Sequence, residues 1–139
     1  SGFIQDLRRI DTAAAWVALA RAQPFRHLGI TDIALIAERL MPQRVPAGMI
    51  ITRAGEWAHS MFVVTTGEVE LRGEGWTRVL GKGDVFDVEA ILGPIQRPAT
   101  ARALTVSDLL VLDVKHFRAL LQASPSLAMA LPPLRRDPP

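Results

Sequence analysis

The chain has 139 residues and a mass of 15.2 kDa, with 49% of its residues hydrophobic and 22% charged. This size fits one domain with its own core, and the composition excludes a disordered chain. The net charge of +2 argues against duplex DNA or an anionic membrane as the main partner. The absence of cysteine excludes disulfides, thiolate zinc sites and cysteine nucleophiles. No apolar run is long enough to span a membrane, so we expect a soluble domain.

Two helices are predicted in the N-terminal third. An alanine-rich run over residues 11–23 has high helix propensity, with Asp11 or Thr12 as its cap. A second helix is expected to start at Thr31, as N-cap, and to stop near Pro42, because its apolar residues follow the i, i+3, i+4, i+7 spacing.

From residue 44 to about residue 113 the pattern changes to short β-strands. Seven of the ten glycines fall within about 36 residues and separate these strands, which favours an antiparallel roll or barrel with tight turns. No helical segment separates the strands, so a parallel sheet is not expected. The expected strands cover Val45 and residues 49–52, 61–65, 68–71, 76–80, 100–105 and 109–112. The expected interior comprises Phe62, Val64, Val69, Leu71, Phe86, Ala103 and Leu112.

Helical spacing returns after the last strand. We predict a helix over residues 114–122 with Asp113 as its cap, followed by at most two turns over residues 126–131. Pro132 and Pro133 stop any longer helix, and residues 133–139 are expected to be disordered.

The sequence contains no catalytic or metal-binding constellation. The three histidines, His27, His59 and His116, lie in different segments, and none shows the spacing that brings two imidazoles to one metal. No nucleophile elbow or Walker glycine loop is present. We therefore expect no enzyme activity, no metal site and no required cofactor.

The stretch from residue 83 to 103 is the most informative part of the chain. A strand leads into one helical turn at about residues 88–92, and Arg97 follows on the way to the next strand. Free backbone N–H groups and a guanidinium together can hold an anion. A solvated arginine, or one paired with a carboxylate, is the more common alternative.

Several segments share a pattern of glycines and turns. They cover residues 24–28, 45–51, 55–56, 61–64, 67–71, 80–86 and 97–100. In this order they resemble the cyclic-nucleotide-binding domain family, over about residues 24–122. The resemblance implies a mainly β fold, an eight-stranded antiparallel β-roll with N-terminal helices and a C-terminal helix. It divides the chain into an N-terminal helical segment (1–23), the β-roll domain (24–131) and a proline-rich tail (132–139).

In that family a phosphate-binding cassette follows the pattern Phe-Gly-Glu-x-Ala-Leu-Leu and then Arg-Ser/Thr-Ala. The resemblance places the arginine that pairs with the cyclic phosphate of a possible cAMP or cGMP ligand at Arg97. It assigns the cassette to Phe86, Asp87, Val88, Glu89, Ala90, Arg97, Pro98, Ala99 and Thr100.

Three cassette positions depart from the family pattern. Asp87 stands in place of glycine and puts a carboxylate beside the intended anion. Val88 replaces the glutamate that would hold the ribose hydroxyl, and Pro98 has no N–H to donate. Glu89 lies one position after the position of the family's glutamate. We expect weak or absent nucleotide binding, with Arg97 paired to Asp87 or Glu89 when no ligand is bound.

The resemblance implies a non-enzymatic regulatory domain. The expected parent is a membrane ion transporter or channel, with this domain in the cytoplasm and residues 11–23 as the coupling element. The first alternative is the ligand-sensor domain of a catabolite-activator-like transcription regulator without its DNA-binding part, and the second is a ligand-free interaction module. We expect no direct nucleic-acid binding by this segment, and an oligomer is possible through the parent. Members of the family commonly close the pocket over the nucleotide base with a long helix. In this chain only residues 126–131 are left to form such a lid.

Overall fold

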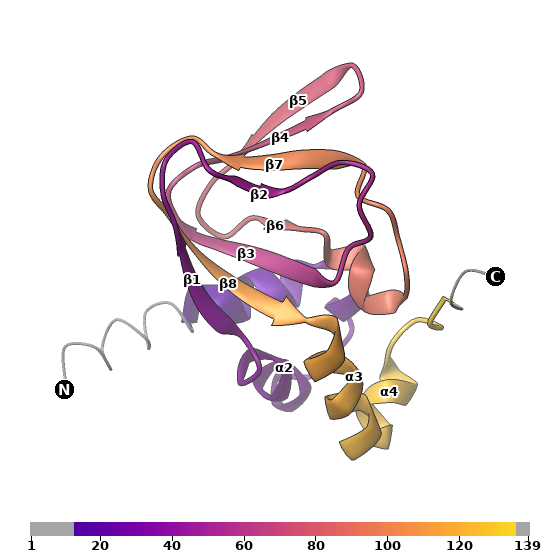
Figure 1. Cartoon of the computed structure of the whole chain (residues 1–139). Helices are drawn as coiled ribbons and strands as arrows, with labels where there is room; N and C mark the ends of the chain where they lie inside the picture. Colours follow the sequence, from indigo (N-terminus) through magenta and orange to yellow (C-terminus); the bar gives the residue numbers. More distant parts are fainter. Residues whose placement is uncertain (1–12, 136–139) are drawn as a thin grey trace.

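In the computed structural model, which describes residues 13–135, eight strands fold into two antiparallel sheets that form a roll (Figure 1). One sheet has the strand order β1-β8-β3-β6 and the other the order β2-β7-β4-β5. The strands are β1 (Met41–Val45), β2 (Ile50–Thr52), β3 (Ser60–Thr66), β4 (Val69–Gly73), β5 (Trp76–Leu80), β6 (Val85–Phe86), β7 (Ala99–Ala103) and β8 (Ser107–Asp113). The predicted fold class is confirmed.

Helices flank the first sheet and the end of the roll (Figure 1). They cover residues 13–21, η1 (Gln23–Phe25), α2 (Ile30–Ala37), η2 (Val88–Leu92), α3 (Val114–Ala123) and α4 (Pro125–Ala130). The Asp113 side chain accepts a hydrogen bond from the Lys115 N–H at 2.7 Å, which confirms the predicted cap of α3. Within residues 13–135, none of these helices is long and apolar enough to cross a membrane.

Three boundaries near the N-terminus differ from the predictions. Helix α2 starts at Ile30 after an extended Gly29, so Thr31 lies inside the first turn and cannot be the N-cap. The helix ends at Ala37, and β1 includes Pro42 because β1 pairs only with β8 and is an edge strand, where a missing N–H is tolerated. The predicted caps of the first helix, Asp11 and Thr12, lie outside the described residues.

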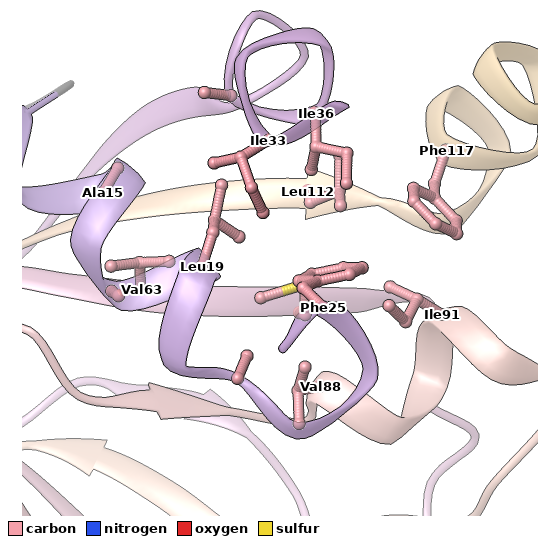
Figure 2. Close-up of a cluster of buried hydrophobic side chains, with 14 of the residues drawn as sticks. Ala15, Leu19, Phe25, Ile33, Ile36, Val63, Val88, Ile91, Leu112 and Phe117 are labelled. Atoms are coloured by element: carbon pink, nitrogen blue, oxygen red, sulfur yellow. The ribbon is translucent and has the colours of Figure 1, made fainter. Parts of the chain in front are cut away.

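The sheet containing β3 separates two hydrophobic clusters. One cluster fills the roll and includes Phe62, Val64, Val69, Leu80 and Phe86. The second, which we call the helix-side cluster, lies between this sheet and the helices and is drawn in Figure 2. It includes Leu19, Phe25, Ile36, Val63 and Phe117. Alternate residues of β3 therefore belong to opposite clusters, which is why both faces of this strand are apolar.

The predicted interior is confirmed with one correction. All seven predicted residues are buried or partly buried in a cluster. Leu112, however, belongs to the helix-side cluster, because Leu109 faces the roll and side chains alternate along β8.

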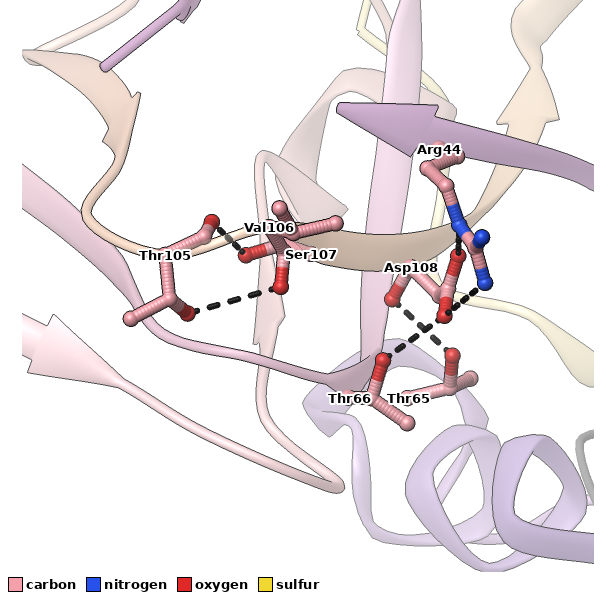
Figure 3. Close-up of polar contacts among 7 residues, drawn as sticks. All are labelled: Arg44, Thr65, Thr66, Thr105, Val106, Ser107 and Asp108. Atoms are coloured by element: carbon pink, nitrogen blue, oxygen red, sulfur yellow. Dashed lines mark hydrogen bonds and ion pairs between the residues drawn. The ribbon is translucent and has the colours of Figure 1, made fainter. Parts of the chain in front are cut away.

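Polar contacts at one end of the roll join β1, β3 and β8 (Figure 3). Arg44 Nε lies 2.8 Å from Asp108 Oδ1, and Thr66 Oγ1 donates to Asp108 Oδ2 at 2.8 Å. The hydrogen bond from Arg44 is the main cause that lowers the pKa of the Asp108 carboxyl, and Thr66 adds to it. These exposed contacts fix strand ends and lie away from the cassette.

The expectation of a disordered tail is wrong for residues 133–135. The backbone N–H of Arg135 donates to Leu92 O, and its guanidinium contacts further carbonyls of the η2 region. The tail is held because η2 ends in carbonyl groups that have no partner within the helix. Residues 136–139 lie outside the described part of the chain.

Candidate functional site

The candidate cassette connects the two sheets of the roll. It starts from β6 in the first sheet, forms η2 and returns through residues 93–98 to β7 in the second sheet. The helical turn predicted at about residues 88–92 matches η2 (Val88–Leu92).

Asp87 lies at the start of the cassette in a left-handed conformation. Its φ of 58° is the only positive φ of a non-glycine residue between residues 13 and 135. Its carbonyl accepts the Ala90 N–H at 3.1 Å and closes the first turn of η2. Aspartate is one of the few residues that tolerate this backbone, so the departure from glycine leaves the turn intact.

The guanidinium of Arg97 pairs with the Asp87 carboxylate. Arg97 Nε lies 2.9 Å from Asp87 Oδ2, and the two side chains are only 10% and 11% exposed. Arg97 Nη1 also donates to Trp57 O at 3.2 Å. The pairing of Arg97 with Asp87 in the ligand-free state was one of the two predicted options. Of the two common alternatives given for this arginine, solvation is excluded by its burial, and pairing with a carboxylate is observed.

The backbone of Arg97 is held by the loop between β2 and β3. The Arg97 N–H donates to Glu56 O at 2.8 Å, and the Gly55 N–H donates to Arg97 O at 2.8 Å. One residue before Arg97, Gln96 forms an antiparallel bridge with Trp57. These contacts fix the backbone of Arg97, and its side chain is held by Asp87 and the Trp57 carbonyl.

Burial raises the pKa of the Asp87 carboxyl above its ordinary value. The hydrogen bond and the charge of Arg97 oppose this shift, and the charge of Glu89 adds a smaller increase. Loss of solvent therefore outweighs the attraction of Arg97. Asp87 takes up a proton at a higher pH than an aspartate in water does.

The other predicted site residues serve the scaffold or face solvent. Phe86 stacks on Phe62 with ring centroids 4.6 Å apart, and Thr100 Oγ1 accepts the Ala54 N–H at 3.0 Å. Val88, Ala90 and Ala99 are buried, whereas Glu89 and Pro98 are exposed. Of the nine predicted residues, all of which lie in the described part of the chain, Asp87 and Arg97 are the two whose side chains form a polar contact with each other.

Two residues that contact the cassette, Trp57 and Arg135, were not predicted from the sequence. Trp57 acts through its backbone carbonyl, and a carbonyl leaves no residue-type signal. Arg135 lies 38 residues after Arg97 in a proline-rich segment that resembled a tail. Only the fold shows that either residue contacts the cassette.

A cavity of about 710 Å³ lies beside the cassette, between the Trp57–His59 loop, the end of η2 and the start of α3. Neither Asp87 nor Arg97 lines it, so it is distinct from the candidate anion site. Within residues 13–135, no group of three or more histidine, aspartate or glutamate side chains is placed to hold a metal ion.

Comparison with known proteins identifies a channel relative. A cyclic nucleotide-gated potassium channel from Rhizobium etli is 34% identical over 128 residues, covering 92% of this chain and 36% of the channel. The chain therefore spans about a third of the length of that relative.

Solved structures show the same fold. The N-terminal domain of a transcriptional regulator from Streptomyces coelicolor A3(2) has a TM-score of 0.70 at 26% identity, covering 82% of this chain and 84% of that one. The cAMP-bound PfPKA-R structure (141-441) has a TM-score of 0.68 at 29% identity, covering 79% of this chain and 41% of that one.

The model of the family described as "Cyclic nucleotide-binding domain" matches residues 42–124. With more than half of its length matched, the chain belongs to the cyclic-nucleotide-binding domain family.

Proposed function

We propose that the chain is a non-enzymatic regulatory domain of a membrane ion channel or transporter, and that it binds cyclic nucleotide weakly or not at all. The channel assignment is supported by the potassium channel relative, which matches almost the whole of this chain. In this proposal residues 24–131 form the regulatory unit, residues 11–23 couple it to the parent and residues 132–139 follow it. The domain lies in the cytoplasm and contacts its parent protein, with no direct contact to nucleic acid.

The observation that carries the weak-binding proposal is the buried pair of Asp87 and Arg97. A carboxylate and a phosphate present the same chemistry to a guanidinium, namely anionic oxygens that accept its N–H groups. Asp87 therefore occupies Arg97 Nε with an anion that the protein itself supplies.

A nucleotide phosphate that reached Arg97 would lie close to the Asp87 carboxylate. Two like charges about 4 Å apart repel by on the order of 4 kcal/mol at an effective dielectric constant of 20. Such a repulsion corresponds to about three decades in affinity. The guanidinium can still offer Nη2 to a ligand, because Nε and Nη1 account for its hydrogen bonds within the described residues.

The remaining departures act in the same direction. Val88 is buried against the helix-side cluster and has no group that could hold a ribose hydroxyl. Glu89 is exposed, so it does not take the place of Val88. Helix α4 ends at Ala130, which leaves little helix to cover a nucleotide base.

Isothermal titration calorimetry with cAMP and cGMP at pH 7 tests the proposal. The chain is expected to bind with a dissociation constant of tens of micromolar or weaker, against about 100 nM for an intact cassette of this kind. Asp87→Asn should tighten binding about tenfold or more, because it removes the competing charge and asparagine tolerates the left-handed backbone.

Glu89→Gln is the matched control. It removes the same charge two residues away, from an exposed side chain without contact to Arg97, and should change affinity less than about threefold because solvent screens it. Submicromolar binding by the unchanged chain would overturn the proposal. An equal gain in both variants would show that net charge, and not the Asp87 pair, limits binding.

The regulator alternative is supported by the likeness to the Streptomyces coelicolor domain. The sequence of the full-length gene product separates the possibilities. A channel or transporter parent requires apolar membrane spans, whereas a transcription regulator requires a helix-turn-helix. A product with neither would favour the ligand-free interaction module.

A further inference from the structure

The end of η2 is held by an arginine from the C-terminal segment. Arg135 Nη2 donates to Glu89 O and, at 2.9 Å, to Gly93 O. Arg135 Nε lies 3.5 Å from Pro94 O, and the Arg135 backbone N–H donates to Leu92 O. One residue thus reaches four carbonyl groups of the cassette.

A glycine makes this close approach possible. Gly93 follows η2 with a φ of 134°, which L side chains rarely adopt. A Cβ at Gly93 would lie 2.6 Å from Arg135 Cβ and 2.8 Å from Arg135 O. The C-terminal segment therefore lies directly on the backbone of the cassette. Leu131, which is buried in the helix-side cluster, fixes the other end of the segment.

Two proline residues connect Leu131 to the contact with η2. Pro132 and Pro133 have restricted φ angles, so the segment between the two anchors has few conformations to lose. This stiffness places the Arg135 side chain on η2 at a low cost in conformational entropy.

Three of the four carbonyl groups that Arg135 binds, those of Leu92, Gly93 and Pro94, lie at or just after the C-terminal end of η2. The last carbonyls of a helix have no N–H donor within it to bond with, and a cation near them is favourable. Helix η2 has only five residues and is not stable alone. Asp87 is the N-cap of η2. Because the helix is so short, unfolding of its C-terminal end would disturb the Asp87–Arg97 pair at its N-terminal end.

We infer that Arg135 is a positioning residue of the cassette, which fixes the end of η2 and couples the Asp87–Arg97 pair to the chain at residues 131–135. The ligand-dependent half of this inference rests on the proposed function, because it needs a nucleotide that acts on Arg97. The ligand-free half concerns only the stability of η2.

Amide hydrogen exchange followed by NMR tests the ligand-free half in the whole chain of 139 residues. Arg135→Ala should accelerate exchange of the amides of residues 88–93 by about tenfold or more relative to the amides of β3 and β8, because it removes the side-chain donors. Arg135→Lys should be intermediate, since a lysine keeps the charge but cannot reach several carbonyls together. Arg39→Ala is the control, because Arg39 is exposed and its guanidinium has no hydrogen bond within the described residues.

Two results would overturn the inference. One is unchanged exchange in residues 88–93 of Arg135→Ala. The other is an equal acceleration over the whole roll, which would make Arg135 a general stabilising residue without a specific effect on the cassette.

The ligand-dependent half uses cAMP at millimolar concentration. In the unchanged chain cAMP should alter the exchange rate of the Arg135 amide at least threefold, and in Arg135→Ala the response at residues 131–135 should be lost. Bound cAMP without any change at residues 131–135 would overturn the coupling. If cAMP and cGMP do not bind even to Asp87→Asn, nucleotide sensing in the proposed function fails, while the ligand-free exchange still decides the role of Arg135.

Discussion

The interior of the roll and the cassette beside it are held by different kinds of interaction. The roll interior is apolar, and its central contact is the stack of Phe62 on Phe86. The cassette is held by directional contacts from charged groups, with Asp87 on Arg97 at one end and Arg135 on carbonyl groups at the other. Apolar packing depends on shape, whereas the cassette contacts use groups that a ligand could also use.

Under the proposed function, this difference explains how a family scaffold keeps its fold while its ligand site changes. Asp87 replaces the glycine of the family pattern without disturbing the turn, because aspartate tolerates the left-handed backbone. The Asp87 carboxylate pairs with Arg97, which under the proposed function is the arginine that a phosphate would use. Substitutions that create a cavity should therefore destabilise the roll, whereas substitutions that change a charge should alter the cassette.

The largest expected effect is in the roll. Phe62 is almost fully buried, so Phe62→Ala should lower the free energy of unfolding by roughly 3 to 5 kcal/mol through lost transfer energy and a cavity. Urea denaturation measures this change. A loss below about 1 kcal/mol would mean that the two sheets do not share a packed interior.

The next effect concerns the buried pair. Arg97→Ala leaves the Asp87 carboxylate buried without its partner and should lower the free energy of unfolding by about 3 kcal/mol at pH 7. This is more than the value of about 1 kcal/mol expected for an exposed pair. The double variant Arg97→Ala/Asp87→Ala removes the orphaned charge and should be more stable than Arg97→Ala alone. Urea denaturation that finds the double variant equally unstable would contradict the proposed pairing.

Restoring the family pattern stepwise should show which departure limits binding. Asp87→Gly should raise cAMP affinity about tenfold or more, and Pro98→Ser should add a smaller gain of up to about tenfold through one new hydrogen bond. Val88→Glu places a carboxyl in the helix-side cluster and should cost roughly 1 to 3 kcal/mol of stability. Calorimetry and thermal unfolding are measured on each variant. A folded variant with all three changes that still does not bind would point to the short helix α4, and not the cassette, as the limiting feature.

The smallest effect is expected at the exposed contacts of β1 and β8. Arg44→Ala should change stability less than any variant above, because solvent screens its pair with Asp108. The lowered pKa of Asp108 means that its contribution is fully present above the ordinary pKa of aspartate and is lost as the pH falls through the lowered pKa. Urea midpoints of the variant and the unchanged chain should therefore converge as the pH falls below the ordinary pKa of aspartate. A difference that grows at low pH would contradict this sign.

The strands and the cassette turn could be predicted because their signals are local. Glycines mark the turns of the roll, and the predicted helical turn after Phe86 agrees with η2. The burial of Arg97 could not be predicted, since it depends on a loop about 40 residues earlier in the chain. The contact of Arg135 with η2 was hidden for the same reason, and the prolines before it indicated a tail.

The pH dependence of cAMP binding tests the central claim most directly, namely that Asp87 competes with the ligand for Arg97. Burial raises the pKa of Asp87 above the usual value of about 4, so protons neutralise its carboxylate as the pH falls from 7 toward that value, while a cyclic phosphate stays ionised. The affinity of the unchanged chain, measured by calorimetry from pH 7 to pH 4.5, should therefore rise as the pH falls. The affinity of Asp87→Asn should be higher at pH 7 and nearly constant over this range. Parallel pH profiles for the two proteins would contradict the account.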